Sequence, residues 1–361
     1  MRIPLMPIAS AIVAGAALLA ATPPAAADDV AEFFKGKTVR IVSGYGGGSS
    51  YSIYARTLAD HLGRFIPGNP TVISTVMAGS GSMKAASYVF NAAPRDGTTL
   101  GAIGRGVASE PLMFGKKSRL KFDPRKFLWL GSLNTEVSIC AAWHTTGVRK
   151  MDDAKKISLF VPTGGATADS ASFTFLTNAL LGTRFKLVAG YRGGDTQNLA
   201  LETGEVQGRC GWSWSSVVAV RMNWVTEKKI NILAQYAMRK HPDLPDVPLI
   251  LDLVSTPEER RIFEIALLRQ EMGRPYIAPP GLPADRATAL QSAFEKTYRD
   301  PRFLATAKKL KLEIVKPRSG PEVARMVDDA FATPQALLDR VAAAVDPRNA
   351  SMSKRKKTDK K

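Results

Sequence analysis

The stretch VRIVSGYGGGSSYSIYARTLADHLG, Val39–Gly63, decides the fold. Its β-branched apolar start predicts a strand, and the glycines that follow predict a turn. Two serines then open a segment whose apolar residues recur at helical spacing. In this order, the first N–H groups of the helix have no partner within the helix and lie at the positive end of its dipole. They stand beside a glycine turn, which a ligand can approach closely. The stretch therefore predicts a seat for an anion.

A plain turn between a strand and a helix explains the same residues, so the stretch alone leaves both interpretations open. The G-x-G-x-x-G spacing of dinucleotide sites is absent, and so is the G-K-[ST] ending of a phosphate-binding P-loop. A small carboxylate is therefore a better candidate for the anion than a nucleotide phosphate.

The same order of strand, small-residue turn and helix recurs along the chain. A turn of small residues follows the predicted strands at Pro70–Met77, Thr98–Ile103, Ile157–Val161, Phe185–Ala189 and Glu205–Cys210. Such repeats predict an α/β fold built on parallel sheets, whose ligands bind at the carboxyl ends of the strands. The long amphipathic segments after Pro257 are expected to pack against these sheets rather than to form the site.

The first 27 residues predict export. Arg2 precedes the apolar run Ile8–Ala21, and three alanines before Asp28 offer a cleavage site near Ala27. This is the pattern of a secretory signal peptide, with a retained anchor as the alternative. No later stretch reaches the roughly 20 apolar residues that a membrane-spanning helix needs. We expect a periplasmic protein with about 330 mature residues, enough for two domains.

The formal net charge of +18 suits an anionic solute, because a positive surface steers anions toward a cleft. Six of the 50 basic residues lie in the tail Lys354–Lys361, which we expect to be disordered. Nucleic-acid binding is not expected, because the basic run lacks interleaved aromatic residues and the chain is predicted to be exported.

The few cysteines and histidines argue against a metal site, a cofactor or catalysis. Cys140 and Cys210 are the only cysteines, and the sequence leaves open whether they form a disulfide or stay as buried thiols. Three scattered histidines, His61, His144 and His241, provide neither a zinc constellation nor a proton shuttle beside a nucleophile. No G-x-S-x-G elbow is present either. We therefore predict a binding protein that is not an enzyme.

An ordered set of motifs resembles one family of receptors. The set comprises Gly46–Arg56, the turn NAAPRDGT at 91–98, Pro162–Thr167, Gly190–Gly194 and GEVQGRCGWSWSS at 204–216. It resembles the substrate-binding receptors of tripartite tricarboxylate transporters, also called Bug-type periplasmic receptors, over about 37–345. The resemblance implies a two-lobed, Venus-flytrap (type II-like) periplasmic binding fold with a parallel-sheet-based domain in each lobe. It also implies capture of a small mono-, di- or tricarboxylate between the lobes and its delivery to the permease subunits of a membrane transporter.

The resemblance also implies a domain division and a set of ligand-binding residues. The division is a signal peptide at 1–27, a first lobe at 28–137, a second lobe at 138–250, a return to the first lobe at 251–345 and a basic disordered tail at 346–361. We expect a monomer. A sensor that docks on a signalling kinase is the alternative function, and a secreted hydrolase is a remoter one. The candidate ligand-binding residues are Tyr45, Gly47, Gly48, Ser50, Ser52, Ser80, Gly81, Thr163, Gly164, Thr167, Tyr191, Arg192, Gly193 and Trp212.

Departures from the family pattern affect the expected ligand. Ser52 stands where the family usually has an acid, Gln207 replaces an aspartate, and Ser80 replaces a smaller residue. The loss of two acids argues against a ligand amino group, whose charge needs a counter-ion. Arg192 is expected to pair with the ligand carboxylate, and Arg105 is a weaker candidate. Trp212 is predicted either to form an aromatic wall or to pack at a hinge.

Overall fold

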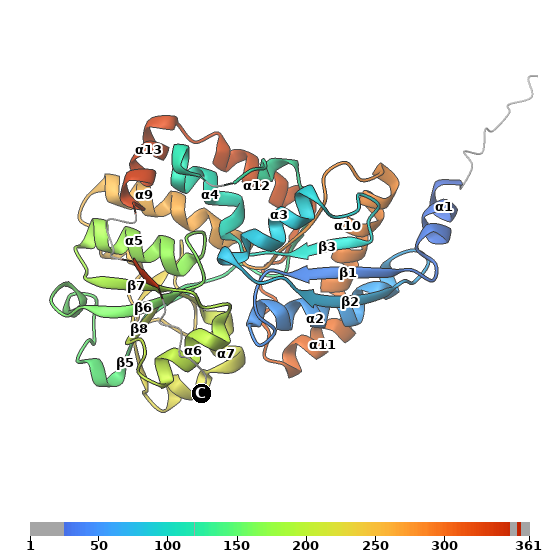
Figure 1. The fold of residues 1–361 in the computed structure, drawn as a ribbon. Helices are drawn as coiled ribbons and strands as arrows, with labels where there is room; N and C mark the ends of the chain where they lie inside the picture. Colours follow the sequence, from blue (N-terminus) through green and yellow to red (C-terminus); the bar gives the residue numbers. More distant parts are fainter. Residues whose placement is uncertain (1–24, 119, 347–351, 355–361) are drawn as a thin grey trace, which may run out of the picture.

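The computed structural model describes residues 25–118, 120–346 and 352–354, which form two lobes side by side (Figure 1). The signal peptide predicted at 1–27 lies almost wholly outside the described residues, as does most of the predicted tail. Among the described residues, no helix is both long and apolar enough to cross a bilayer.

A six-stranded sheet forms the centre of the first lobe, in the order β11-β4-β10-β3-β1-β2. Strand β1 pairs in parallel with β2 and β3, whereas β10 runs antiparallel to both β3 and β4. The strands are β1 Thr38–Ser43, β2 Thr71–Val76, β3 Thr99–Ala102, β4 Leu128–Ser132, β10 Pro275–Ala278 and β11 Arg318–Ser319. The carboxyl ends of the three parallel strands therefore meet at one edge of the sheet.

Two three-stranded sheets form the second lobe. One has the order β12-β7-β6 and is parallel, and the other has the order β8-β5-β9 and is antiparallel. The strands are β5 Ser138–Trp143, β6 Leu159–Thr163, β7 Phe185–Ala189, β8 Gly208–Ser213, β9 Ile230–Tyr236 and β12 Met352–Lys354. Strand β12 lies within the tail that the sequence predicts to be disordered. Its backbone pairs with β7, which would otherwise be the edge of this sheet and which accepts a neighbour regardless of side-chain type.

Thirteen α-helices are present among the described residues, and they cover these sheets. They are α1 Ala25–Phe34, α2 Ser50–Leu62, α3 Met83–Asn91, α4 Gly106–Phe114, α5 Asp169–Leu181, α6 Gly194–Glu202, α7 Trp214–Val220, α8 Met222–Thr226, α9 Pro257–Leu267, α10 Ala284–Arg299, α11 Pro301–Lys309, α12 Gly320–Phe331 and α13 Gln335–Ala344. Helix α2 begins where the Ser49 side chain accepts a hydrogen bond from the Ser52 N–H, as the sequence predicts. The strand, turn and helix of Val39–Gly63 are thus confirmed.

Helices α9 and α13 pack into the core of the second lobe, where Phe263 and Val341 are fully buried (Figure 1). Helices α10 and α11 pack on the first lobe through Phe294 and Phe303. The predicted division instead placed the whole of 251–345 in the first lobe. Amphipathic spacing shows that a helix buries one face, but it does not show which lobe receives that face.

The chain crosses between the lobes at Leu133–Val137 and again just before β10. Two backbone hydrogen bonds join these segments. The Glu136 N–H donates to the Gln270 carbonyl oxygen at 2.8 Å, and the Gly273 N–H donates to the Asn134 carbonyl oxygen at 2.8 Å. A pair of short connected segments between two lobes is the usual form of a hinge.

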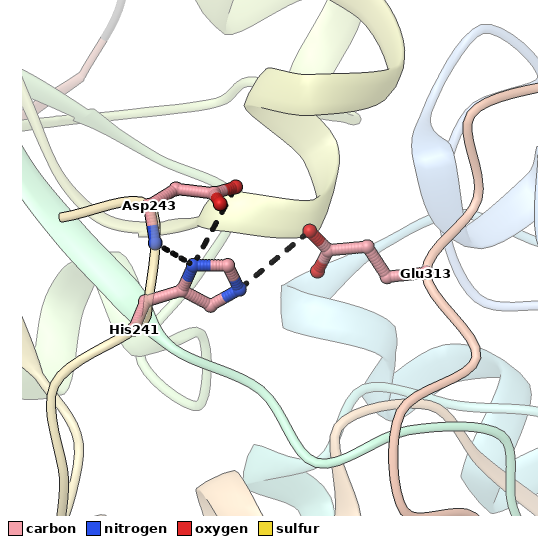
Figure 2. Close-up of side chains that lie close together, drawn as sticks. All are labelled: His241, Asp243 and Glu313. Carbon is pink, nitrogen blue, oxygen red and sulfur yellow. Dashed lines mark hydrogen bonds and ion pairs between the residues drawn. The ribbon is translucent and has the colours of Figure 1, made fainter.

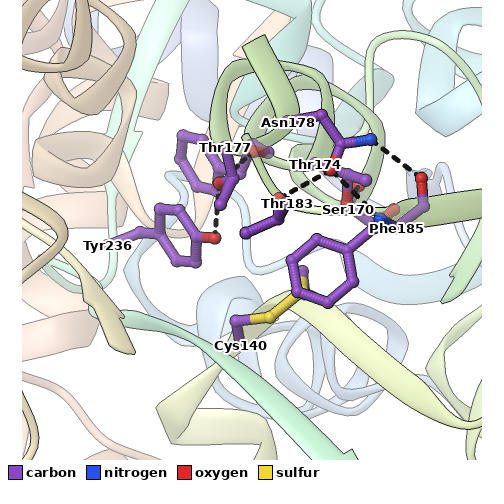
Figure 3. The surroundings of a disulfide bond; sticks show 10 residues. Cys140, Ser170, Thr174, Thr177, Asn178, Thr183, Phe185 and Tyr236 are labelled. Carbon is purple, nitrogen blue, oxygen red and sulfur yellow. Dashed lines mark hydrogen bonds between the residues drawn. A yellow bond between two sulfur atoms is a disulfide. The ribbon is translucent and has the colours of Figure 1, made fainter. Parts of the chain in front are cut away.

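Cys140 and Cys210 form a disulfide that joins β5 to the neighbouring strand β8. Both residues are buried in the second-lobe core, beneath α5 (Figure 3). Above the disulfide, the Thr177 hydroxyl lies 2.7 Å from that of Tyr236. The structure thus favours the first of the two states that the sequence left open.

Candidate functional site

Loops of the two lobes touch where the parallel strands end. Gly46 N–H, after β1, donates to the Arg192 carbonyl oxygen at 3.1 Å. Gly81 N–H, after β2, donates to the Gly164 carbonyl oxygen at 3.1 Å. The Thr167 hydroxyl donates across the same gap to the carbonyl oxygen of Ser80, at 3.0 Å. The lobes are therefore closed on each other, glycine turn against glycine turn.

Gly81 is a tight point of this contact. Its φ of +64° lies in the left-handed region, and a Cβ at this position would stand 2.4 Å from Thr167 Oγ1. No side chain fits between the lobes there, so glycine is needed both for the backbone conformation and for closure.

A cavity of about 80 Å³ lies beside these contacts, between the lobes. The first lobe contributes the turn after β1 and the start of α4, and the second lobe contributes the starts of α5 and α6 and the end of β8. The lining side chains that carry charge or a ring are Tyr45, Tyr51, Arg105, Asp169, Asp195, Arg209 and Trp212.

Arg105, at the N-terminal end of α4, connects the two lobes through its guanidinium. It binds Asp169 of the second lobe, with Nε at 2.6 Å and Nη2 at 2.5 Å from the same carboxylate oxygen. Nη2 also donates to Ser138 Oγ at 2.8 Å. Burial acts to lower the pKa of Arg105, but the adjacent Asp169 carboxylate outweighs it and raises the pKa, so the arginine stays charged.

Arg274, which precedes β10, makes a second buried pair on the hinge. Its Nη2 lies 3.1 Å from Glu136 Oε2, and it donates to the Ser215 hydroxyl at 2.6 Å. The guanidinium stacks 4.3 Å from the ring centroid of Tyr51. A third buried arginine, Arg269, contacts Asp169 at 3.2 Å.

Arg209, on β8, differs from these three because no carboxylate lies within ion-pair distance of it among the described residues. It is 7% exposed, donates to the side chain of Asn198 and stacks over Trp212 with the guanidinium carbon 4.4 Å from the ring centroid. Burial, with repulsion from Arg221, lowers its pKa to about 9. Within the part of the chain that the structure describes, Arg209 is thus a buried cation of the cavity lining without a protein counter-ion.

Comparison with known proteins bears on the fold. No protein-family model matches the sequence, and no curated protein matches it. Among solved structures, the periplasmic binding protein BugD aligns at 18% identity over 88% of this chain and 99% of its own, with a TM-score of 0.65. MatC from Rhodopseudomonas palustris, with bound malate, aligns at 20% identity over 86% of this chain and 99% of its own, with a TM-score of 0.66.

A further protein of R. palustris, Rpa4515 with adipate, aligns at 17% identity over 86% of this chain and 97% of its own, with a TM-score of 0.65. The chain has the two-lobed periplasmic binding fold. This confirms the predicted fold class. In this fold the interlobe cavity described above lies where the lobes close.

Four of the predicted site residues line the cavity: Tyr45, Gly48, Ser50 and Trp212. Trp212 is 1% exposed, packs in the second-lobe core and lines the cavity, while its role as an aromatic wall for a ligand stays a prediction. Another group forms the contact between the lobes beside the cavity, namely Ser80, Gly81, Gly164, Thr167 and, through Gly46, the backbone of Arg192.

The remaining candidates lie outside the cavity lining. The Ser52 and Thr163 hydroxyls are buried in bonds within their own loops, to the Tyr45 and Gly165 carbonyl oxygens. The Tyr191 hydroxyl binds Glu205 at 2.9 Å. The side chain of Arg192 is exposed and does not line the cavity, because the loop presents its backbone to the first lobe. Gly47 and Gly193 do not line the cavity either.

Sequence reasoning missed most of the charged groups of the site. Arg105 was a weaker candidate, whereas Asp169, Asp195, Arg209, Arg269 and Arg274 were not singled out as ligand-binding residues. They are spread over 169–274 of the sequence, and no single motif contains them all. The one available signal was Arg209 itself, an arginine inside a short predicted strand whose neighbours are apolar or small.

His241, Asp243 and Glu313 form a separate cluster on the line between the lobes (Figure 2). The His241 Nδ1 atom accepts the Asp243 N–H at 3.2 Å, and its Nε2 atom lies 3.7 Å from Glu313 Oε1. The two carboxylates face opposite nitrogens of the ring, since Nδ1 lies 3.6 Å from Asp243 Oδ2. The arrangement suits an imidazole held between two acids.

Proposed function

We propose that this protein is an extracytoplasmic solute-binding receptor that captures a small organic carboxylate between its lobes. A membrane transporter of the tripartite tricarboxylate type would take up the ligand. On this proposal the protein binds its ligand unchanged and acts in the periplasm after loss of the signal peptide.

The charge around the interlobe cavity is the observation that carries the proposal. Arg105, Arg209, Arg269 and Arg274 are all buried there, against the carboxylates of Glu136, Asp169 and Asp195. One positive charge is in excess among these side chains. A small anion that reaches this space gains a favourable interaction that a neutral solute of the same shape lacks.

The way the lobes meet supports a mechanism of closure. Loop contacts such as Gly81–Gly164 exist only when the lobes are together, and residues from both lobes line the cavity. A ligand that touches both lobes therefore stabilises the closed form over the open one by population shift. The closed form would then present one continuous surface to the membrane partner.

The fold of the aligned structures also supports the proposal. MatC was solved with malate and Rpa4515 with adipate, both of them dicarboxylates. At 17 to 20% identity this likeness establishes the fold alone, so the ligand class has to be tested on this chain.

A thermal-shift panel tests the proposal directly. The purified protein would be heated with mono-, di- and tricarboxylates, aromatic acids, amino acids and the uncharged diamide of each dicarboxylate. We expect at least one acid to raise the melting temperature by mass action and its diamide to leave it unchanged. A panel in which no acid acts, or in which acid and amide act equally, would contradict the proposal.

A further inference from the structure

Two charged groups in the second-lobe lining of the interlobe cavity have unsatisfied atoms, and the indole N–H of Trp212 is a third unsatisfied group there among the described residues. The first is the guanidinium of Arg209, whose Nε atom is buried without a hydrogen-bond partner among the described residues. Its Nη1 atom donates to the side chain of Asn198 and, at 3.4 Å, to the Gly194 carbonyl oxygen. A buried guanidinium with only neutral acceptors is costly, because its charge has lost water without gaining an anion.

The second group is the carboxylate of Asp195, in the first turn of α6. Its Oδ1 atom is buried and has no hydrogen-bond donor among the described residues. The carboxylate lies against the glycine turn of the first lobe, since a Cβ on Gly48 would stand 3.0 Å from Oδ2. A buried carboxylate oxygen without a hydrogen-bond donor is unfavourable, and a bound molecule can provide the missing donor.

The two groups do not satisfy each other. No oxygen of Asp195 lies within 4.0 Å of a nitrogen of Arg209, although the two attract each other through space. Both line the same cavity, Arg209 on β8 and Asp195 on α6. Gly194 precedes Asp195 in α6, and a Cβ on Gly194 would stand 3.0 Å from Arg209 Nη2. The Arg209 guanidinium therefore lies against the first turn of α6.

We propose that Arg209 and Asp195 form a ligand subsite for a 2-hydroxy carboxylic acid, which deepens the proposed function and rests on it. The ligand carboxylate binds the free edge of the Arg209 guanidinium, and the neighbouring hydroxyl donates to Asp195 Oδ1. One molecule thereby provides both the missing anion and the missing donor. The Trp212 ring stacks against the Arg209 guanidinium and so fixes the plane in which the guanidinium binds the ligand carboxylate.

A hydroxyl fits this subsite better than an ammonium group does. An ammonium would also donate to Asp195, but Arg105 and Arg209 line the cavity, and Arg269 and Arg274 contact the lining residues Asp169 and Ser213 from behind. The positive charge of a ligand ammonium would be repelled by these arginines, whereas a hydroxyl donates to Asp195 without that repulsion.

Matched ligands test the assignment by isothermal titration calorimetry. Malate and succinate differ by one hydroxyl, lactate and propionate differ in the same way, and aspartate replaces the hydroxyl with an ammonium. We expect the purified protein to bind at least one hydroxy acid about tenfold or more tightly than its deoxy partner, because a site built to bond a hydroxyl rejects the analogue that lacks it. Aspartate should bind more weakly than malate.

Two variants and two controls assign the effect to residues. Asp195→Asn should bring the affinities of the hydroxy and deoxy acids to within about threefold of each other, and Arg209→Gln should weaken both by about tenfold or more. Glu202→Gln, exposed on the same helix, and Arg239→Gln, exposed after β9, should change neither. Arg209→Lys keeps the charge without the fork and should recover part of the affinity, which separates loss of binding from loss of folding.

The outcomes separate the subsite from the proposed function. If no carboxylate binds the unaltered protein, the proposed function fails, and the subsite with it. If a carboxylate binds but Arg209→Gln keeps its full affinity, or Asp195→Asn keeps its full preference for the hydroxy acid, the subsite alone is overturned. A preference for aspartate over malate would assign the donor to an ammonium group and overturn the choice of hydroxyl.

Discussion

Gly81 of the first lobe donates its backbone N–H to the carbonyl oxygen of Gly164 of the second lobe, at 3.1 Å. Each glycine belongs to a turn that follows a parallel strand. The contact places the carboxyl ends of the strands of the two lobes against each other, and the cavity with its buried arginines lies beside it. Closure and binding are therefore coupled at one place in the molecule.

Gly81→Ala should hold the lobes apart. The new Cβ would stand 2.4 Å from Thr167 Oγ1 and 2.9 Å from Ala168 N, both in the other lobe. We expect a larger radius of gyration by small-angle scattering and a carboxylate affinity at least about tenfold lower, which corresponds to about 1.4 kcal/mol.

Gly182→Ala is the matched control for this variant. Gly182 has a similar φ of +69° but no atom within 4 Å of its would-be Cβ, so it incurs the same backbone cost of about 1–2 kcal/mol without a clash between lobes. If Gly81→Ala is as compact as Gly182→Ala and binds equally well, the contact does not govern closure.

Glu136→Ala should destabilise the hinge strongly. Glu136 and Arg274 are each 1% exposed and lie 3.1 Å apart, so the variant leaves a buried guanidinium without its acid. We expect a loss of about 3–5 kcal/mol in the free energy of unfolding, measured by urea denaturation. Glu271→Ala removes a half-exposed partner of Arg318 and should cost at most about 1 kcal/mol. Equal losses in the two variants would contradict the buried pair.

Glu313 should make stability depend on pH near neutrality. Burial, with repulsion from Glu136, raises the pKa of Glu313 to about 7. A carboxyl whose folded pKa exceeds its unfolded value contributes stability that is full below the unfolded pKa and is lost as the pH rises through the folded one. The stability of the protein relative to Glu313→Gln should therefore fall between pH 6 and pH 8, by about 1 kcal/mol.

His241, next to Glu313, acts in the opposite direction at lower pH. Burial lowers the pKa of His241 from 6.5, so its contribution is present above that value and is lost as the pH falls through the lowered pKa. Above pH 6.5 the difference between the protein and Glu313→Gln thus reports Glu313. A difference that stays flat from pH 6 to pH 8, or that grows, would show that the pKa of Glu313 is not raised.

The disulfide between Cys140 and Cys210 should contribute measurably to stability. It closes a loop across a sequence separation of 70, for which restriction of the unfolded chain predicts about 4 kcal/mol. Reduction should lower the midpoint of guanidinium unfolding, while the double variant Cys140→Ser/Cys210→Ser should show no response to reductant. Two alkylated thiols in the unreduced, denatured protein would contradict the bond.

The fold was predictable because its signals are local. A β-branched run, a glycine turn and a serine cap lie within Val39–Gly63, and each acts on its own neighbours. The charged site was not predictable, because its parts meet only through the hinge. Glu136 and Arg274, for example, pair across 138 residues, and nothing in either neighbourhood indicates the other.

Arg192 and Arg209 show the limit most clearly. Arg192 lies in a glycine loop that the structure does bring to the interface, but it contributes its carbonyl oxygen while its side chain is exposed. Arg209 lies in a predicted strand and was not among the candidate ligand-binding residues, yet its buried side chain lines the cavity. Sequence patterns place a loop, but the direction of a side chain depends on the packing of both lobes.

Calorimetric titration of the purified protein with the most stabilising carboxylate, and with the diamide of that acid, tests the central claim most directly. If the cleft closes on an anion, the acid should bind at one site per chain, and the diamide should show no measurable binding. Equal binding of the two, or no heat with any acid, would contradict the account.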